Sequence, residues 1–180
     1  MDSYTERHGL LWAIQRSSRY HARRQAFFER WRRVTAGIGI IFGSAAAADL
    51  LKGGGNSIAL AAGIIVAISS AVDLVVGTAD MAWQHRELRR KFISLEAEIL
   101  RSPEEPAESL IHHWQEERLS AEADEPPKYV ALDLLCENEM SRAQGNGDRV
   151  ILFRWERLTA HWWRWDDLPS KALKRPLPAD

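Results

Sequence analysis

The sequence predicts an all-α integral membrane protein: a long antiparallel two-transmembrane helical hairpin that extends into the cytoplasm, plus a small cytoplasmic helical region. Three observations support this. Two long apolar runs lie close together, segments rich in helix-forming residues continue on both sides of them, and no strand-like alternation of polar and apolar residues stands out.

The two apolar runs have the length and composition of membrane spans. Residues 34–51 contain one charged residue, Asp49, and residues 58–78 contain one, Asp73. As helices they measure about 27 and about 31 Å, close to the thickness of the hydrocarbon core of a bilayer. Both are apolar on all faces, and a short glycine-rich loop joins them, which favours antiparallel neighbours. A buried hairpin in a soluble helical bundle is the alternative.

Basic residues flank the two runs on one side only, whereas the loop between the runs has only Lys52. This asymmetry is the positive-inside pattern, and it predicts that both termini are cytoplasmic. Tryptophan is also typical of the membrane interface. The predicted membrane-interface residues are Trp31, Trp83, Arg30, Arg32, Arg86, Arg89 and Arg90.

The helices are predicted to continue beyond the membrane, because residues 10–31 and 81–100 contain no proline or glycine. Apolar residues recur at helical spacing in the second segment, and three aromatic residues of the first can face them. The first set is Leu88, Phe92, Leu95 and Ile99, and the second is Tyr20, Phe27 and Trp31.

The predicted domain organisation has three parts: a membrane hairpin at 1–102, a cytoplasmic helical region at 103–168 and a loose, proline-rich tail at 169–180. Within the cytoplasmic region, one acidic helix is expected at 107–122. A second begins at Pro127 and ends at the glycines after residue 144.

A last helix is expected from Asp148 onward, with an apolar stripe rich in tryptophan. The spacing favours a core or subunit contact, and the alternative is an interfacial helix on the inner leaflet. The stripe comprises Ile151, Trp155, Leu158, Trp162 and Trp165.

Asp73 is the most informative residue of the second run, because a carboxylate inside a span is costly unless it is paired or faces water. Two explanations stay open. The hairpin geometry allows an ion pair with Arg33 inside one subunit. Alternatively, Asp73 lies on a narrow face of small and polar residues that lines a pore, where a ring of carboxylates favours cations. The predicted pore-lining residues are Gly63, Val66, Ser70, Asp73, Gly77 and Asp80.

Gly39 and Gly43 form a GxxxG pattern in the first run, a spacing that lets two helices approach closely. It suits a contact within the hairpin as well as a contact between subunits.

Charge is distributed unevenly along the chain. Residues 7–33 contain eight arginines and one acid, and residues 96–125 contain ten acids and two arginines. Because the basic block adjoins a predicted span, the anionic inner leaflet is a more economical partner than nucleic acid. The basic block can also pair with the acidic block. The lipid bilayer is therefore an expected partner and nucleic acid is not.

Residues that would indicate catalysis or cofactor binding form no convincing pattern. The six histidines have no metal-ligand spacing with cysteine, and the pair His113 and Glu117 is weak evidence for zinc. Cys136, the single cysteine, lies in an apolar stripe typical of a packed thiol. No glycine-rich phosphate loop follows a strand. No metal, catalytic residue or cofactor is expected, and no cleavable signal peptide is expected at the start.

Two segments resemble the SLATT family, two-transmembrane effector domains of bacterial conflict and antiphage systems. The first is RSSRYHARRQAFFERWRR, residues 16–33, leading into the hairpin. The second is ALDLLCENEMSRAQG, residues 131–145, similar to the family's C-terminal helix with its Cys-x-Asn-Glu element. In this chain that element is Cys136, Asn138 and Glu139. The resemblance covers roughly residues 10–147.

The resemblance implies a pore- or channel-forming effector of the bacterial inner membrane, which homo-oligomerises and disrupts the membrane gradient in antiphage defence or programmed cell death. It also implies a separate sensor protein or a nucleotide as the trigger. The alternative function is a non-conducting two-transmembrane scaffold that recruits a cytoplasmic partner.

Overall fold

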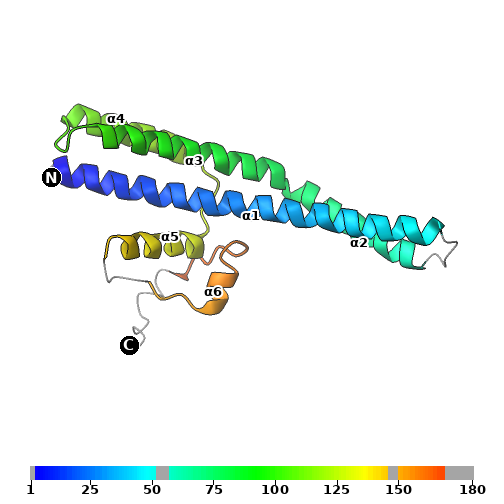
Figure 1. Cartoon of the computed structure of the whole chain (residues 1–180). Helices are drawn as coiled ribbons and strands as arrows, with labels where there is room; N and C mark the ends of the chain where they lie inside the picture. The colour runs from blue at the N-terminus through cyan, green and yellow to red at the C-terminus, as the bar shows by residue number, and fades with distance from the viewer. Residues whose placement is uncertain (1–2, 52–56, 146–149, 169–180) are drawn as a thin grey trace. The chain divides into compact units, whose positions relative to one another are not determined.

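The computed structural model describes residues 3–51, 57–145 and 150–168. In these ranges the regular elements are all α-helices, as the sequence predicts (Figure 1). The helices are α1 (Ser3–Leu51), α2 (Ser57–Val76), α3 (Thr78–Arg101), α4 (Glu108–Ala123), α5 (Val130–Ala143) and α6 (Arg154–Leu158).

The chain divides into two compact units. The apolar unit is Arg24–Gln84, and the packed unit combines Met1–Arg23 with His85–Asp180. This division differs from the sequence-based boundary at residue 102. The reason is that the start of α1 and most of α3 lie outside the apolar runs and bury their own apolar side chains against α4 and α5. The expected tail at 169–180 lies outside the described residues.

The first core of the packed unit joins the start of α1 to α3 and α4, which run beside it (Figure 1). Trp114 of α4 is 1% exposed, and its indole Nε1–H donates a hydrogen bond to Glu98 of α3 over 2.9 Å. The predicted stripe on α3 is buried, which confirms that spacing. The core comprises Leu10, Leu11, Ile14, Phe92, Leu95, Ile99, Ile111, Trp114 and Ala121.

A second core lies where Tyr20 of α1 meets α5 and the segment after α6. The Tyr20 hydroxyl accepts a hydrogen bond from the backbone N–H of Tyr129 at 3.0 Å. Arg16 lies 3.7 Å from Asp133 of α5, and Arg23 pairs with Glu139. These two arginines of the basic block therefore pair with acids of α5 and not with the acidic block at 96–125.

The apolar unit has a different character, because few of its side chains are buried. Ala62 is the one buried residue of α2. Asp49 near the end of α1 accepts a hydrogen bond from the backbone N–H of Ala59 at 3.3 Å, which satisfies a donor in the first turn of α2. The ends of the two helices are thereby tied together.

Gly77 interrupts what the sequence predicts as one continuous helix. Its φ is +62°, in the left-handed region, so α2 ends at Val76 and α3 begins at Thr78. A side chain built on Gly77 would meet only Asp80 Oδ2 at 3.9 Å, so the conformation and not the space requires glycine.

The predicted last helix is wrong in its extent. α6 has only five residues, and the chain then turns, with the backbone N–H groups of Trp162 and Trp163 both donating to the carbonyl of Thr159 at 2.9 Å. This reversal buries Ala160 and Leu168 in the second core. Tryptophan, threonine and histidine are weak helix formers, so a helix through residues 159–165 has little local support. Burial of Ala160 and Leu168 therefore outweighs the helical spacing of the tryptophans. Asp148 lies outside the described residues.

Gly77→Ala is expected to destabilise the chain by about 1–2 kcal/mol, the cost of a left-handed conformation for a residue with a Cβ. The matched control is Gly37→Ala, in the middle of α1 with open space around the new methyl group, where alanine is favoured over glycine by up to about 1 kcal/mol. Both stability changes are measured by titrating the detergent-solubilised variants with SDS and following their helix content. Equal midpoints for the two variants would contradict the structural role of Gly77.

Candidate functional site

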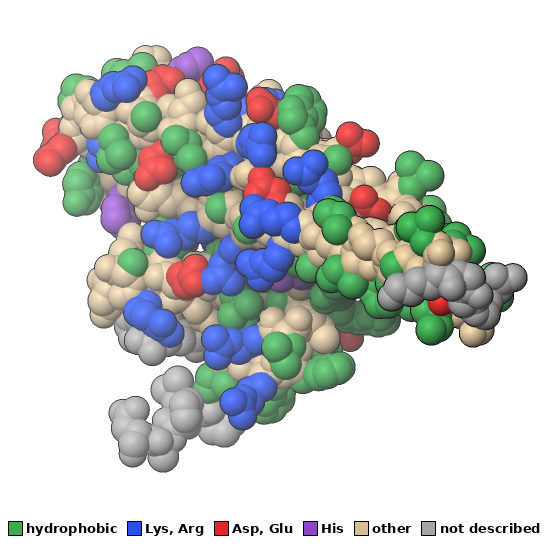
Figure 2. Space-filling view, turned by 45° about the vertical axis from the view of Figure 1, so that its right-hand side comes forward, with side chains coloured by type: hydrophobic (Ala, Val, Ile, Leu, Met, Phe, Trp, Pro, Cys, Tyr) green, Lys and Arg blue, Asp and Glu red, His purple; other side chains and the backbone are tan. Residues whose placement is uncertain are grey.

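The apolar unit exposes aliphatic side chains all around its two helices. Ile40 of α1 is 70% exposed, and Leu74 and Val75 of α2 are 83% and 86% exposed. Both helices are long and apolar enough to cross a membrane. In the most apolar 18-residue stretch of each helix, 0% of the residues are buried in the first helix and 6% in the second. Figure 2 shows hydrophobic side chains over this part of the surface. A core helix of a soluble protein would instead be mostly buried.

Asp73 has a partner within the apolar unit. The Thr78 hydroxyl donates a hydrogen bond to Asp73 Oδ1 at 2.5 Å, across the interruption at Gly77. Arg33, the ion-pair partner considered from the sequence, instead lies 3.6 Å from Glu29 on its own helix, with its side chain 76% exposed. The structure therefore gives Asp73 and Arg33 different partners.

The predicted pore-lining residues do not share one uninterrupted helix. Four of them belong to α2, Gly77 is the interruption itself and Asp80 lies in the first turn of α3. Gly63, Ser70 and Asp80 are exposed, while Val66, Asp73 and Gly77 are half-buried. Nothing in the apolar unit covers Gly63, where an added Cβ would meet no atom within 4 Å.

Among the residues that the structure describes, the GxxxG pattern makes no close packing contact. A Cβ added at Gly39 or at Gly43 would meet nothing within 4 Å. The small-residue surface of α1 is therefore open to a helix from elsewhere.

The predicted interface residues lie near the ends of the apolar runs that are farther from the glycine-rich loop in sequence. Trp83 is 62% exposed, and Trp31 is half-buried with its ring 5.8 Å from that of Phe27. The arginines of this set are all exposed: Arg30, Arg32, Arg86, Arg89 and Arg90.

A buried polar cluster in the packed unit, which the sequence does not reveal, joins three segments. His21 of α1 and His85 of α3 are both 0% exposed, and their Nδ1 atoms lie 2.9 Å apart. His21 Nε2 lies 3.0 Å from Glu125, between α4 and α5. The His21 ring stacks on Phe92 with centroids 5.6 Å apart. These residues are 64 and 104 positions apart in sequence, so no local spacing could have indicated the cluster.

The geometry limits where protons can lie in this cluster. An ionised Glu125 carboxylate only accepts hydrogen bonds, so His21 donates through Nε2–H. In a neutral His21 the Nδ1 atom then accepts, and His85 donates its Nδ1–H. Protons on both facing Nδ1 atoms would place two donors 2.9 Å apart, so a hydrogen bond here requires a proton on only one of them. The cluster therefore links α1, α3 and the α4–α5 segment through directed hydrogen bonds.

Glu125 is held ionised by its neighbours. Burial raises the pKa of this carboxyl, but hydrogen bonds from His21 and from Lys128, whose Nζ lies 2.9 Å from Glu125 Oε2, lower it more. The net pKa lies below its usual value of about 4.5. A carboxyl whose pKa is lowered by folding stabilises the folded state at pH values above its usual pKa, and this stabilisation is lost as the pH falls through the lowered pKa.

Cys136 is a packed thiol, as its stripe on α5 predicts. It is 0% exposed, and burial raises its pKa to about 12, so it carries no thiolate for nucleophilic chemistry at neutral pH. Among the described residues no group of three or more histidine, cysteine or carboxylate side chains could hold a metal ion.

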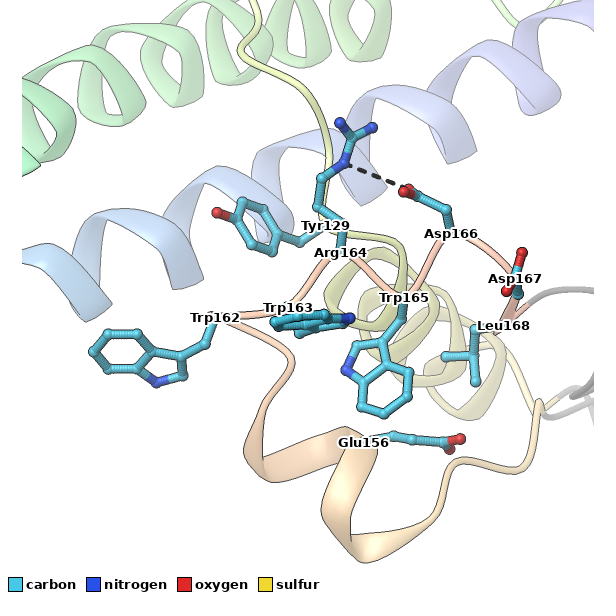
Figure 3. A pocket seen from close by; sticks show the side chains of 9 residues that line it. All are labelled: Tyr129, Glu156, Trp162, Trp163, Arg164, Trp165, Asp166, Asp167 and Leu168. Carbon is cyan, nitrogen blue, oxygen red and sulfur yellow. Dashed lines mark ion pairs between the residues drawn. The ribbon is translucent and has the colours of Figure 1, made fainter.

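An open pocket of about 780 Å³ lies in the segment after α6 (Figure 3). Trp165 in this segment has φ +53°, which is strained for a bulky residue, and its indole N–H donates to the Thr159 hydroxyl at 3.1 Å. The Arg164 carbonyl accepts a hydrogen bond from the Val130 N–H at 3.1 Å, which anchors the segment on α5. The lining residues are Tyr129, Glu156, Trp162, Trp163, Arg164, Trp165, Asp166, Asp167 and Leu168.

Comparison of the chain with protein-family models, with curated proteins and with solved structures gives no match. The similarity to SLATT domains therefore remains an expectation from the two sequence segments that carry it.

Glu125→Gln is expected to destabilise the packed unit at pH 7 by about 1.5–3 kcal/mol, because hydrogen bonds to a charged group are lost. The difference from the unaltered chain should shrink as the pH falls below about 4.5 and the native carboxyl itself takes up a proton. Urea unfolding of the full chain in mild detergent, followed between pH 7 and pH 3, measures this.

The matched control is Glu122→Gln, since the Glu122 carboxylate pairs with Arg118 on the same helix and is partly exposed. That change should alter stability by less than about 0.5 kcal/mol at pH 7. Equal losses in the two variants at pH 7 would contradict a special role for Glu125.

Proposed function

We propose that this chain is an integral membrane protein whose apolar unit crosses the bilayer as a helical hairpin. One observation carries the proposal: aliphatic side chains on all faces of two helices of spanning length are exposed. In water such a surface is unfavourable by about 25 cal/mol for each Å² of apolar area, whereas in lipid it carries no such cost.

The distribution of charge supports an orientation. The exposed arginines cluster at the two inner ends of the hairpin, so both termini lie in the cytoplasm of a bacterial inner membrane. The packed unit, with its charged surface, lies in water on that side.

Within this topology we propose a pore-forming effector that assembles from several copies. The open surfaces at Gly39, Gly43 and Gly63 support close contact between helices of different subunits. Asp73, which accepts a hydrogen bond from Thr78 and is half-buried, would face the aqueous path of the assembled pore. A ring of such carboxylates would favour cations.

The resemblance to SLATT domains supplies the biological setting. The proposed activity is collapse of the inner-membrane gradient, as in antiphage defence or programmed cell arrest, with a separate sensor protein or a nucleotide as trigger.

A non-conducting scaffold is the second candidate, and the self-contained core of the packed unit favours it. Two buried cores hold that unit together, while α4 exposes Glu108, Glu116 and Glu117 to a possible cytoplasmic partner. In this case deletion of residues 103–180 would abolish function, and the hairpin alone would be inert.

The chain is expected to stay in the pellet when bacterial membranes are extracted at alkaline pH, because a spanning hairpin is held by its apolar surface and not by charge. An immunoblot of pellet and supernatant, with a peripheral membrane protein as reference, measures this. Release together with the reference would indicate a soluble bundle and overturn the membrane assignment.

Controlled expression is expected to collapse the membrane potential before viability is lost, as read with a voltage-sensitive dye. In planar bilayers the unaltered chain should select cations. Asp73→Lys should reduce or reverse that selectivity, and Asp73→Ala should weaken it or abolish toxicity. The matched control, Asp49→Asn, removes the other charge of the apolar runs but keeps an acceptor oxygen for Ala59.

Unchanged conductance and toxicity in both Asp73 variants would remove Asp73 from the pore. A steady potential and no conductance, with the protein confirmed in the membrane and its proposed trigger supplied, would favour the scaffold.

A further inference from the structure

Five large apolar side chains stand exposed close together on and around α6. Their exposed fractions lie between 58% and 73%. We call this set the aromatic surface; it comprises Phe153, Trp155, Leu158, Trp162 and Trp163.

The exposure is a property of a folded segment. Ala160 is 0% exposed and Leu168 is 1% exposed in the second core, and Glu156 accepts a hydrogen bond from the Phe153 N–H at 2.8 Å. Trp165 turns inward and packs against the same core. The segment thus has one side anchored in the packed unit and the other side presenting aromatic rings outward, which contradicts the core interpretation of Trp155 and Trp162.

The composition of the aromatic surface indicates what it contacts. Three of its five members are tryptophans, whose rings combine an apolar body with an N–H donor and prefer the boundary between acyl chains and head groups. Exposed arginines alternate with these rings at Arg154 and Arg157. The acid between them, Glu156, is 5% exposed and accepts a hydrogen bond from the backbone N–H of Phe153, so no exposed acid lies between the two arginines in sequence.

A layer of anionic phospholipid head groups is complementary to this combination. Arginine binds phosphate through its planar set of donors, and indole rings enter the interface beside it. A symmetric contact with a second copy would bring Arg154 and Arg157 close to their counterparts in a dehydrated interface, where like charges repel.

We propose that the aromatic surface lies on the head-group layer of a phospholipid bilayer, with Trp155, Trp162 and Trp163 at the acyl boundary and Arg154 and Arg157 on phosphates. The inference rests on the proposed function in one respect. The chain continues without a break from the apolar unit into the packed unit, so the spans tether the aromatic surface to a bilayer and raise its local concentration there.

The test uses the full chain reconstituted into vesicles of phosphatidylethanolamine and phosphatidylglycerol, with and without brominated acyl chains that quench nearby tryptophan. The key variant is Trp155→Phe/Trp162→Phe/Trp163→Phe. If these three indoles contact lipid, the fraction of total emission that is quenched falls in the variant. If they do not, unquenched emitters are removed and the fraction rises, which overturns the proposal.

The matched control is Trp114→Phe, which removes an indole that is 1% exposed in the first core. The quenched fraction should rise in this control, opposite in sign to the key variant. A fall in the control would mean that the packed unit has opened in the vesicles, and the proposal would be overturned.

A second variant, Trp31→Phe/Trp83→Phe, separates failure of this inference from failure of the proposed function. A fall in its quenched fraction reports that the inner ends of the spans contact lipid. A fall there together with a rise in the key variant rejects only the aromatic surface. A rise in the quenched fraction of Trp31→Phe/Trp83→Phe together with a fall in the key variant rejects the membrane spans. The aromatic surface would then be a peripheral lipid contact.

Two further measurements separate lipid from a second copy as the occupant. Arg154→Glu/Arg157→Glu should reduce quenching of the aromatic surface in anionic vesicles by at least half, because phosphate contacts become repulsive. Chemical crosslinking should give the same oligomer with and without the key substitutions. Loss of the oligomer, with no change in quenching, would assign the surface to a subunit contact.

Discussion

The rest of the structure depends on one constraint: the apolar unit has no core large enough to bury its own side chains. Aliphatic residues cover α2 and the second half of α1, and Ala62 is the one buried residue of α2. Backbone groups in these helices are satisfied by their own hydrogen bonds, so the remaining requirement is an apolar environment around the side chains. Every polar group placed there needs a local partner. Asp73 finds one in Thr78 and Asp49 finds one in the N–H of Ala59.

The packed unit differs from the apolar unit because it has two buried cores and, apart from the aromatic surface, a largely charged exterior. The start of α1 serves two cores at once, one shared with α3 and α4 and the other with α5. Arg16 and Arg23 pair with acids of α5, so part of the basic block is used inside the fold. The His21–His85–Glu125 cluster fastens the same helices with directed hydrogen bonds, which specify register in a way that apolar contacts alone do not.

The two units share α1, which runs without interruption from one into the other, whereas the return path through α2 and α3 is interrupted at Gly77. The interruption sits beside the only acid of the second apolar run, and Thr78, the first residue after it, satisfies that acid. A backbone irregularity and the carboxylate of an otherwise apolar run therefore lie next to each other. Trp165, with φ +53° in the wall of the pocket in Figure 3, is a second irregularity of the backbone.

The sequence by itself determined the helical fold, the two apolar segments and the buried stripe on α3, because hydrophobic period and run length are local properties that neighbouring residues encode directly. It also indicated that Cys136 packs inside. Only the tertiary structure decided which partner each polar residue takes: Thr78 for Asp73, Glu29 for Arg33, and the two histidines for each other. The tertiary structure also decided that Trp155 and Trp162 are exposed. The sequence could not show this, since the spacing of Trp155, Trp162 and Trp165 suits a buried helix face. The chain reverses after Thr159 to bury Ala160 and Leu168, and burial against distant α5 outweighs that local spacing.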